Sequence, residues 1–206
     1  KRQDAVIVPT PQQAQDMADR FGMATPIFTI RVAFVKAADV AANRLPFSQR
    51  EQHLVVHVAR LAPEKQQASS IRAFAQVVKA IPDAKLELWG YANGDMAPKL
   101  HALVEKLHLA DHVFFKGYTR DIAAVYNRAQ LGLLPSSAEG FPLTLIEAQA
   151  HGLPMIANDI HYGPADILAN GKSGLLTQNG DIDGLANAII GLSLIHISEP
   201  TRHLRI

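Results

Sequence analysis

The chain has 206 residues, a net charge of +1 and no cysteine, with 48% hydrophobic and 19% charged residues. These values are typical of a globular protein that holds one full domain and part of another. The absence of cysteine excludes a disulfide framework and a thiol nucleophile. The small net charge argues against a positive electrostatic field of the whole protein that would attract nucleic acid. No apolar run approaches the roughly 18 residues of a membrane-spanning helix, and no signal peptide is visible, so we expect a cytoplasmic protein.

The first 45 residues predict a few short elements that are too small to close a hydrophobic core. The predicted order is a short buried strand, a polar helix, two apolar runs without helical period and a connector, at residues 4–10, 12–21, 26–30, 32–35 and 37–50. Because the chain begins with Lys1 rather than Met, we expect it to be part of a longer protein.

From residue 51 onward, strand-like and helical patterns alternate. Short apolar runs predict strands at residues 54–58, 86–89, 113–115, 131–134, 155–157 and 174–176. Helical spacing of apolar residues, with stops at Pro82 and Gly152, predicts helices around residues 71–78, 100–107 and 143–151. This alternation is typical of a doubly wound, Rossmann-like α/β fold with a parallel sheet covered on both faces.

In such sheets, ligands bind outside the carboxyl ends of the strands. The segments that follow the predicted strands are residues 60–65, 90–95, 117–120, 136–143 and 158–163. A binding site is expected among them.

Two cations follow the first strand of this region. Arg60 and Lys65 suit a pyrophosphate, since arginine offers a forked set of donors and lysine a point charge. The alternative is that both are solvated surface charges at a helix start, and the two residues by themselves favour this alternative.

A second group follows the fourth strand. Gly140 allows a ligand to approach the backbone closely, and Pro142 suits the first turn of a helix whose free N–H groups attract anions. Glu139 precedes that helix, and Glu147 lies on the same face as Leu143. This arrangement suits Glu139 for a sugar and Glu147 for a ribose. Each position has an alternative that explains it equally well. Glu139 can be a carboxylate that interacts favourably with the helix dipole, and Glu147 can be an ordinary solvated helix residue.

Four motifs in order resemble the group 1 glycosyltransferases (family four, with the GT-B fold). They are Val58-Ala-Arg-Leu-Ala-Pro-Glu-Lys-Gln, Leu86-Glu-Leu-Trp-Gly, Phe115-Lys-Gly-Tyr-Thr and Glu139-Gly-Phe-Pro-Leu-Thr-Leu-Ile-Glu-Ala. The family's hallmark, Glu-x7-Glu, is present as Glu139 and Glu147. The resemblance covers about residues 4–190 and identifies the chain as the C-terminal half of a GT-B enzyme.

The resemblance implies a role for each motif. Arg60 and Lys65 would hold the diphosphate of the donor and stabilise the leaving nucleotide, Glu139 would contact the transferred sugar, and Glu147 would bind the ribose. The other implied binding residues are Gly140, Phe141, Pro142 and Leu143 for sugar and phosphate, and Gly117 and Tyr118 for the base. The family retains anomeric configuration and usually works without a bound metal, so we expect no metal and no cofactor, with the cations in their place.

The implied activity is transfer of a hexose from a nucleotide sugar, UDP-glucose or UDP-N-acetylglucosamine, to a cell-wall polymer or a protein. Residues 159–164 and 170–175 resemble the branch of poly(glycerol-phosphate) α-glucosyltransferases, which points to teichoic acid as an acceptor. Nucleic acid is not an expected partner, and a peripheral membrane contact of the full-length protein is left open.

The resemblance also divides the chain. Residues 1–45 would be a remnant of the N-terminal acceptor domain plus a linker, and residues 46–191 the nucleotide-sugar-binding domain. Residues 192–206 resemble the translation of a sequencing adapter, so we expect a non-native tail there. With most of the acceptor domain missing, the isolated chain is expected to be inactive in transfer.

Two other functions compete with this prediction. One is a non-catalytic nucleotide-sugar-binding module that supports a partner transferase; the other is a GT-B-fold epimerase. A sugar-facing carboxylate at Glu139 argues against the first, and the Glu-x7-Glu context against the second.

Overall fold

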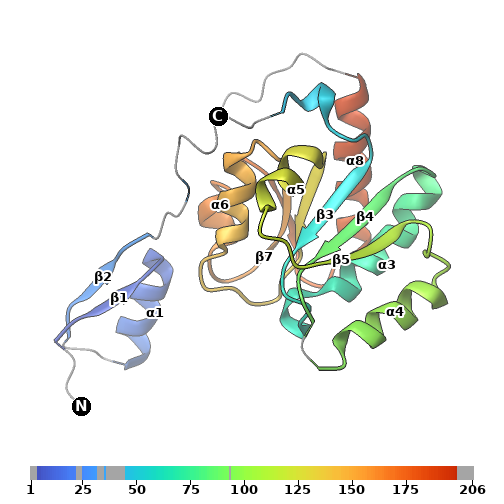
Figure 1. Cartoon of the computed structure of the whole chain (residues 1–206). Coiled ribbons are helices and arrows are strands. Elements are labelled where there is room, and N and C mark those ends of the chain that lie inside the picture. Colours follow the sequence, from blue (N-terminus) through green and yellow to red (C-terminus); the bar gives the residue numbers. More distant parts are fainter. Residues whose placement is uncertain (1–3, 22–24, 32–34, 36–44, 93, 199–206) are drawn as a thin grey trace.

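A six-stranded parallel sheet forms the centre of the molecule (Figure 1). The computed structural model describes residues 4–21, 25–31, 35, 45–92 and 94–198, and within them the strand order is β5-β4-β3-β6-β7-β8. The strands are β3 (Leu54–Val58), β4 (Lys85–Trp89), β5 (Val113–Gly117), β6 (Leu131–Leu134), β7 (Met155–Asp159) and β8 (Leu175–Gln178). All are parallel to their neighbours, and the predicted doubly wound fold is confirmed.

The strand order reverses once, between β3 and β6. Successive strands β3, β4 and β5 build the sheet in one direction, and β6, β7 and β8 build it in the other. This is the Rossmann order, in which the reversal opens a crevice at the carboxyl edge of the sheet.

Helices cover both faces of the sheet, as the alternation of patterns predicted. Along β3, Val55 packs in a core with α3 (Gln67–Ala80), α4 (Met96–Lys106) and α8 (Ile182–Ser198). Its neighbours Leu54 and Val56 point to the opposite face, which α5 (Ile122–Arg128), α6 (Leu143–Ala150) and the residues around α7 (Pro164–Ile167) cover. Successive strand side chains point to opposite faces, so β3 is buried from both sides.

The sequence prediction lacks two short helices. It missed α5 and α7, because helices of 7 and 4 residues are too short to show a period. The last helix, α8, ends at Ser198, and the predicted domain end at residue 191 stays a prediction. No helix in the described part of the chain combines the length and apolar character needed to cross a membrane.

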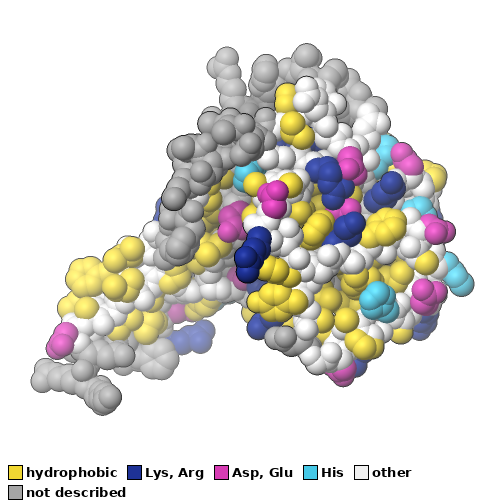
Figure 2. Space-filling model, viewed as in Figure 1, with side chains coloured by type: hydrophobic (Ala, Val, Ile, Leu, Met, Phe, Trp, Pro, Cys, Tyr) yellow, Lys and Arg dark blue, Asp and Glu magenta, His cyan; other side chains and the backbone are white. Residues whose placement is uncertain are grey.

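The N-terminal segment forms a small separate βαβ unit (Figure 1). It consists of β1 (Val6–Val8), α1 (Pro11–Phe21) and β2 (Ile27–Thr29), with the two strands parallel. The predicted burial of the first strand is wrong in part, since Ile7 is 64% exposed, and Figure 2 shows apolar side chains over these strands. Residues 32–34 of the predicted run at 32–35, and most of the connector, lie outside the described residues.

A buried arginine joins two helices on one face of the sheet. Arg50 donates from Nη1 to the carbonyls of Tyr126 (3.0 Å) and Ala129 (2.9 Å), and from Nη2 to the carbonyl of His151 (2.6 Å). These carbonyls lie at the C-terminal ends of α5 and α6, where the helices leave acceptors without intrahelical partners. Arg50 therefore fixes the end of α6 opposite to the predicted site.

A histidine is buried in the middle of the sheet. His57 on β3 is 1% exposed, and its Nδ1 shares a hydrogen bond of 2.9 Å with the hydroxyl of Ser70 on α3. Burial, and secondarily the charge of Lys65, lowers the pKa of His57 from 6.5 to about 3. The folded chain therefore holds this imidazole neutral at physiological pH.

Replacing Arg50 tests the helix contacts. We expect Arg50→Met to lower the free energy of unfolding by about 3 kcal/mol, because buried carbonyls lose their donors. Urea unfolding measures the change, and Arg50→Lys is expected to recover only part of it, since lysine has no forked donor set. The control Arg72→Met, at an exposed position of α3, should change stability by no more than about 0.5 kcal/mol. Equal losses for Arg50 and Arg72 would contradict the structure.

The buried histidine predicts a pH dependence of stability. Between pH 6.5 and about 3 the unfolded chain binds a proton at His57 that the folded chain does not. Stability from this group is complete above pH 6.5 and falls by about 1.4 kcal/mol per unit as pH decreases through that window. His57→Gln should remove this part of the slope in urea unfolding at pH 6 and pH 5, whereas His101→Gln, at an exposed position, should keep it. The same slope in wild type and His57→Gln would refute the assignment.

Candidate functional site

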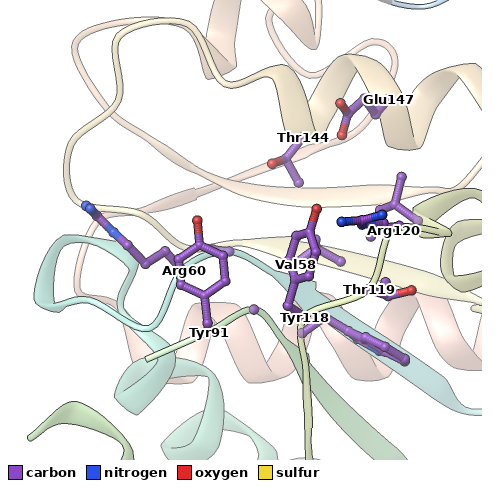
Figure 3. A pocket seen from close by; sticks show the side chains of 12 residues that line it. Val58, Arg60, Tyr91, Tyr118, Thr119, Arg120, Thr144 and Glu147 are labelled. Carbon is purple, nitrogen blue, oxygen red and sulfur yellow. The ribbon is translucent and has the colours of Figure 1, made fainter. Parts of the chain in front are cut away.

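An open pocket of about 340 Å³ lies at the carboxyl edge of the sheet, beside the reversal of strand order. Its walls come from the segments after β3, β4 and β5 and from α6. The polar and aromatic side chains that line it are Arg60, Trp89, Tyr91, Tyr118, Thr119, Arg120, Thr144 and Glu147 (Figure 3). The sequence analysis expected a site at these strand ends.

A glycine brings the ends of β3 and β4 together on one side of the pocket. Gly90 has a φ of +140°, and a Cβ atom added to it would lie 2.1 Å from the carbonyl oxygen of Ala59. Only glycine fits so close to the neighbouring backbone. The segments then continue side by side, with a bridge between Leu61 and Ala92.

Two exposed tyrosines form one side of the pocket. The rings of Tyr91 and Tyr118 have centroids 5.6 Å apart and are tilted by 56°, and the residues are 56% and 65% exposed. In Figure 3 both hydroxyls point to the side on which α6 carries Thr144 and Glu147. Aromatic faces of this kind can stack on a planar ring. The predicted Gly117 does not line the pocket itself; with a φ of +72° it turns the chain out of β5 just before Tyr118.

The opposite side presents a carboxylate from α6. Glu147 and Thr144 are three residues apart and share the face that lines the pocket. The Tyr126 hydroxyl donates to Glu147 Oε2 at 3.4 Å. Partial burial raises the pKa of Glu147, an effect that the Tyr126 hydrogen bond opposes. Leu143, which the sequence analysis placed on the face of Glu147, does not line the pocket, and Thr144 takes that place.

Two ion pairs occupy the segment after β3. Arg60, on the pocket wall, pairs with Glu64 at 2.7 Å, and Lys65 pairs with Glu139 at 2.6 Å. Lys65 and Glu139 are not among the residues that line the pocket. The structure thus divides the predicted binding residues into a pocket group and an adjacent ion pair.

Backbone contacts explain why Lys65 and Glu139 meet. Lys65 ends the short 3-10 helix η2 (Pro63–Lys65), and the N–H of Ser137, after β6, donates to the carbonyl of Glu64 at 2.8 Å. The loops after β3 and β6 are therefore bound together across the reversal point. No motif indicates this pairing, because 74 residues separate the two side chains along the chain.

The loop before α6 leads into a helix end that no side chain caps. Pro142 is the N-cap residue of α6 and not part of its first turn, which corrects the sequence prediction. The carbonyl of Gly140 accepts a hydrogen bond of 3.2 Å from Gln13 Nε2 of the N-terminal unit. Gly163 packs against this loop, since a Cβ atom there would lie 2.4 Å from Pro142 Cδ. Phe141, the remaining predicted residue of the loop, also lies outside the pocket lining.

The N-terminal unit also contacts the loop after β7. Asp16 of α1 accepts hydrogen bonds from the hydroxyl of Tyr162 and, at 2.8 Å, pairs with Nε2 of His161. These contacts, that of Tyr162 first, lower the pKa of Asp16. A second pair joins Arg31 to Asp166 of α7 at 2.9 Å. The N-terminal unit thus lies against the loop that supports Pro142.

Most of the residues that line the pocket were absent from the predicted set, among them Tyr91, Arg120 and Thr144. Tyr91 and Arg120 lie in segments that the strand-end rule selected, but no motif singled them out. Thr144 could have been found from its spacing of three residues to Glu147. In the described part of the chain, no three His, Asp or Glu side chains are grouped so that they could hold a metal ion.

Relatives of known description match nearly the whole chain. It is 36% identical over 187 residues to the exopolysaccharide phosphotransferase SCO2592 of Streptomyces coelicolor. The aligned region covers 90% of this chain and 19% of that protein. It is 32% identical over 189 residues to the poly(glycerol-phosphate) alpha-glucosyltransferase of Bacillus subtilis. The aligned region covers 92% of this chain and 27% of that protein. The chain therefore spans well under a third of either relative, and the activities in their names are those of the longer proteins.

A solved structure and a family model agree with these relatives. S. aureus TarM, solved as a mutant in complex with fondaparinux, alpha-GlcNAc-glycerol and UDP, is similar with a TM-score of 0.83 and 31% identity. The similarity covers 93% of this chain and 37% of TarM, and it confirms the predicted GT-B half. The model described as glycosyl transferases group 1 matches residues 44–202. With the sheet order, the switch-point pocket and the Glu-x7-Glu motif already in place, this match shows that the chain belongs to the group 1 glycosyltransferases.

Proposed function

We propose that this chain is the donor-binding part of a retaining hexosyltransferase and that it holds a UDP-linked sugar in the pocket at the carboxyl edge of the sheet. The observation that supports this most is the meeting of Arg60, Tyr118 and Glu147 in one pocket, from the segments after β3 and β5 and from α6. A cation, an exposed aromatic ring and a carboxylate match the diphosphate, the base and the ribose of such a donor.

In this proposal each side of the site takes one part of the donor. Tyr118, with Tyr91 beside it, stacks on the base, and Glu147 accepts hydrogen bonds from the ribose hydroxyls. Arg60 and Lys65 bind the diphosphate, and Glu139 with the backbone of residues 140–143 contacts the sugar. The two cations neutralise the phosphate charge, so the proposed site needs no metal.

The proposed reaction exchanges one bond at the anomeric carbon for another on the same face of the sugar. The bond to the phosphate oxygen breaks, and UDP leaves with its electron pair. The acceptor oxygen bonds to the anomeric carbon, and its proton passes to the leaving phosphate. Arg60 and Lys65 assist because negative charge grows on the phosphate as this bond breaks.

The donor sugar is proposed to be glucose or N-acetylglucosamine, and the acceptor a teichoic acid or a protein. The name of the Bacillus subtilis relative and the ligands of TarM support this range of sugars and polymers. Residues 1–45 are assigned to the acceptor domain, whose remaining part the transfer step requires.

Glu147 tests the binding proposal. Glu147→Ala should weaken UDP binding about tenfold or more, because a hydrogen bond to a charged acceptor contributes about 1.5 to 3 kcal/mol. Titration calorimetry with UDP, UDP-glucose and UDP-N-acetylglucosamine measures the loss. Glu105→Ala removes an exposed carboxylate from α4 and should leave the affinity unchanged. No UDP binding by the wild type, or equal affinities for wild type and Glu147→Ala, would refute the proposal.

Transfer tests the assignment of residues 1–45. The isolated chain, incubated with UDP-glucose and poly(glycerol phosphate), should release UDP no faster than the Glu139→Ala variant does, because most of the acceptor domain is missing. Product formation is followed by transfer of radiolabelled glucose. Clear transfer by this chain alone would contradict the need for the rest of that domain.

A further inference from the structure

The two cations of the proposed diphosphate site have partners in different surroundings. The side chains of Arg60 and Glu64 are 51% and 38% exposed, so their ion pair lies largely in solvent. Those of Lys65 and Glu139 are only 21% and 9% exposed. Lys65 is thus held by a carboxylate from another loop in a much drier environment.

This difference in exposure determines how easily each cation can bind a further anion. An exposed pair is weakened by solvent and salt, so Glu64 can move away from Arg60 with little loss. Arginine also has five donors, so it can keep one partner while it binds another. A partly buried pair is screened much less, so a second anion that approaches Lys65 must compete with a carboxylate already bound at 2.6 Å.

A diphosphate that reaches Lys65 also comes close to the carboxylate of Glu139. Two anions that share one cation repel each other, and a hydrogen-bond donor placed between them offsets part of this repulsion. The hydroxyls of a sugar are such donors. A nucleotide sugar therefore brings a partner for Glu139, and a free nucleoside diphosphate does not.

We propose that Glu139 competes with the diphosphate for Lys65 and thereby makes the site prefer a nucleotide sugar over the free nucleoside diphosphate. This inference rests on the proposed function, because it takes its ligand from it. It gives Glu139 a role in specificity besides contact with the sugar. Once the sugar has been transferred, the carboxylate returns to Lys65 and favours release of the product.

The variant Glu139→Gln separates the two effects. Glutamine keeps the size of the side chain and an oxygen that accepts from Lys65, but it carries no charge. We expect UDP to bind about fivefold more tightly to the variant, whereas UDP-glucose binds with unchanged or lower affinity. A residue that only supports the fold would weaken both ligands alike. Calorimetry with both ligands gives the ratio of affinities, and thermal unfolding shows that the variant is folded.

The matched control is Glu64→Gln, which removes the same charge from the exposed pair nearby. It should change UDP affinity less than about twofold. If Glu139→Gln unfolds, Glu139→Asp keeps the charge but withdraws it from Lys65, and UDP should again bind more tightly than to the wild type.

The outcomes separate this inference from the proposed function. UDP binding to the wild type, without tighter binding to the Glu139 variant, overturns the competition and leaves the proposed function intact. An equal gain for Glu64→Gln also overturns it, since the effect would then be one of total charge. Failure of both wild type and Glu139→Gln to bind UDP overturns the two together.

Discussion

The parallel pairing of β3 with β6 is the constraint on which the rest of the molecule depends. The chain leaves β3 toward the face of α3 and leaves β6 toward the opposite face, where α6 lies. The two connections therefore diverge and leave a gap between them at the carboxyl edge. Polar side chains that follow the two strands meet at this gap, where a ligand can reach both.

The stability of the sheet layers and the arrangement of the site depend on the same helix. One end of α6 presents Thr144 and Glu147 to the pocket, and the carbonyl of its C-cap residue His151 accepts from the buried Arg50. Arg50 also binds the end of α5. A guanidinium outside the pocket lining therefore helps to set the position of a carboxylate within it, because it holds the C-terminal end of the helix that carries this carboxylate.

The charged groups at the edge of the sheet are balanced within the chain. Arg60 and Lys65 each have a carboxylate partner, one in solvent and the other largely buried. The N-terminal unit adds its own polar contacts, through Asp16 and Gln13, to loops on either side of Pro142. The proposed donor site is thus bordered by segments from both parts of the chain.

The sequence by itself determined the fold class, the six strands of the large sheet, the edge at which a site forms and three residues of the pocket, Arg60, Tyr118 and Glu147. It could do so because hydrophobic periodicity and the motifs are local properties of the chain. It missed α5, whose 7 residues are too few to show a period. Only the tertiary structure decided the strand order, the entry of Tyr91 and Arg120 into the pocket and the pairing of Lys65 with Glu139, because these depend on which distant segments pack side by side.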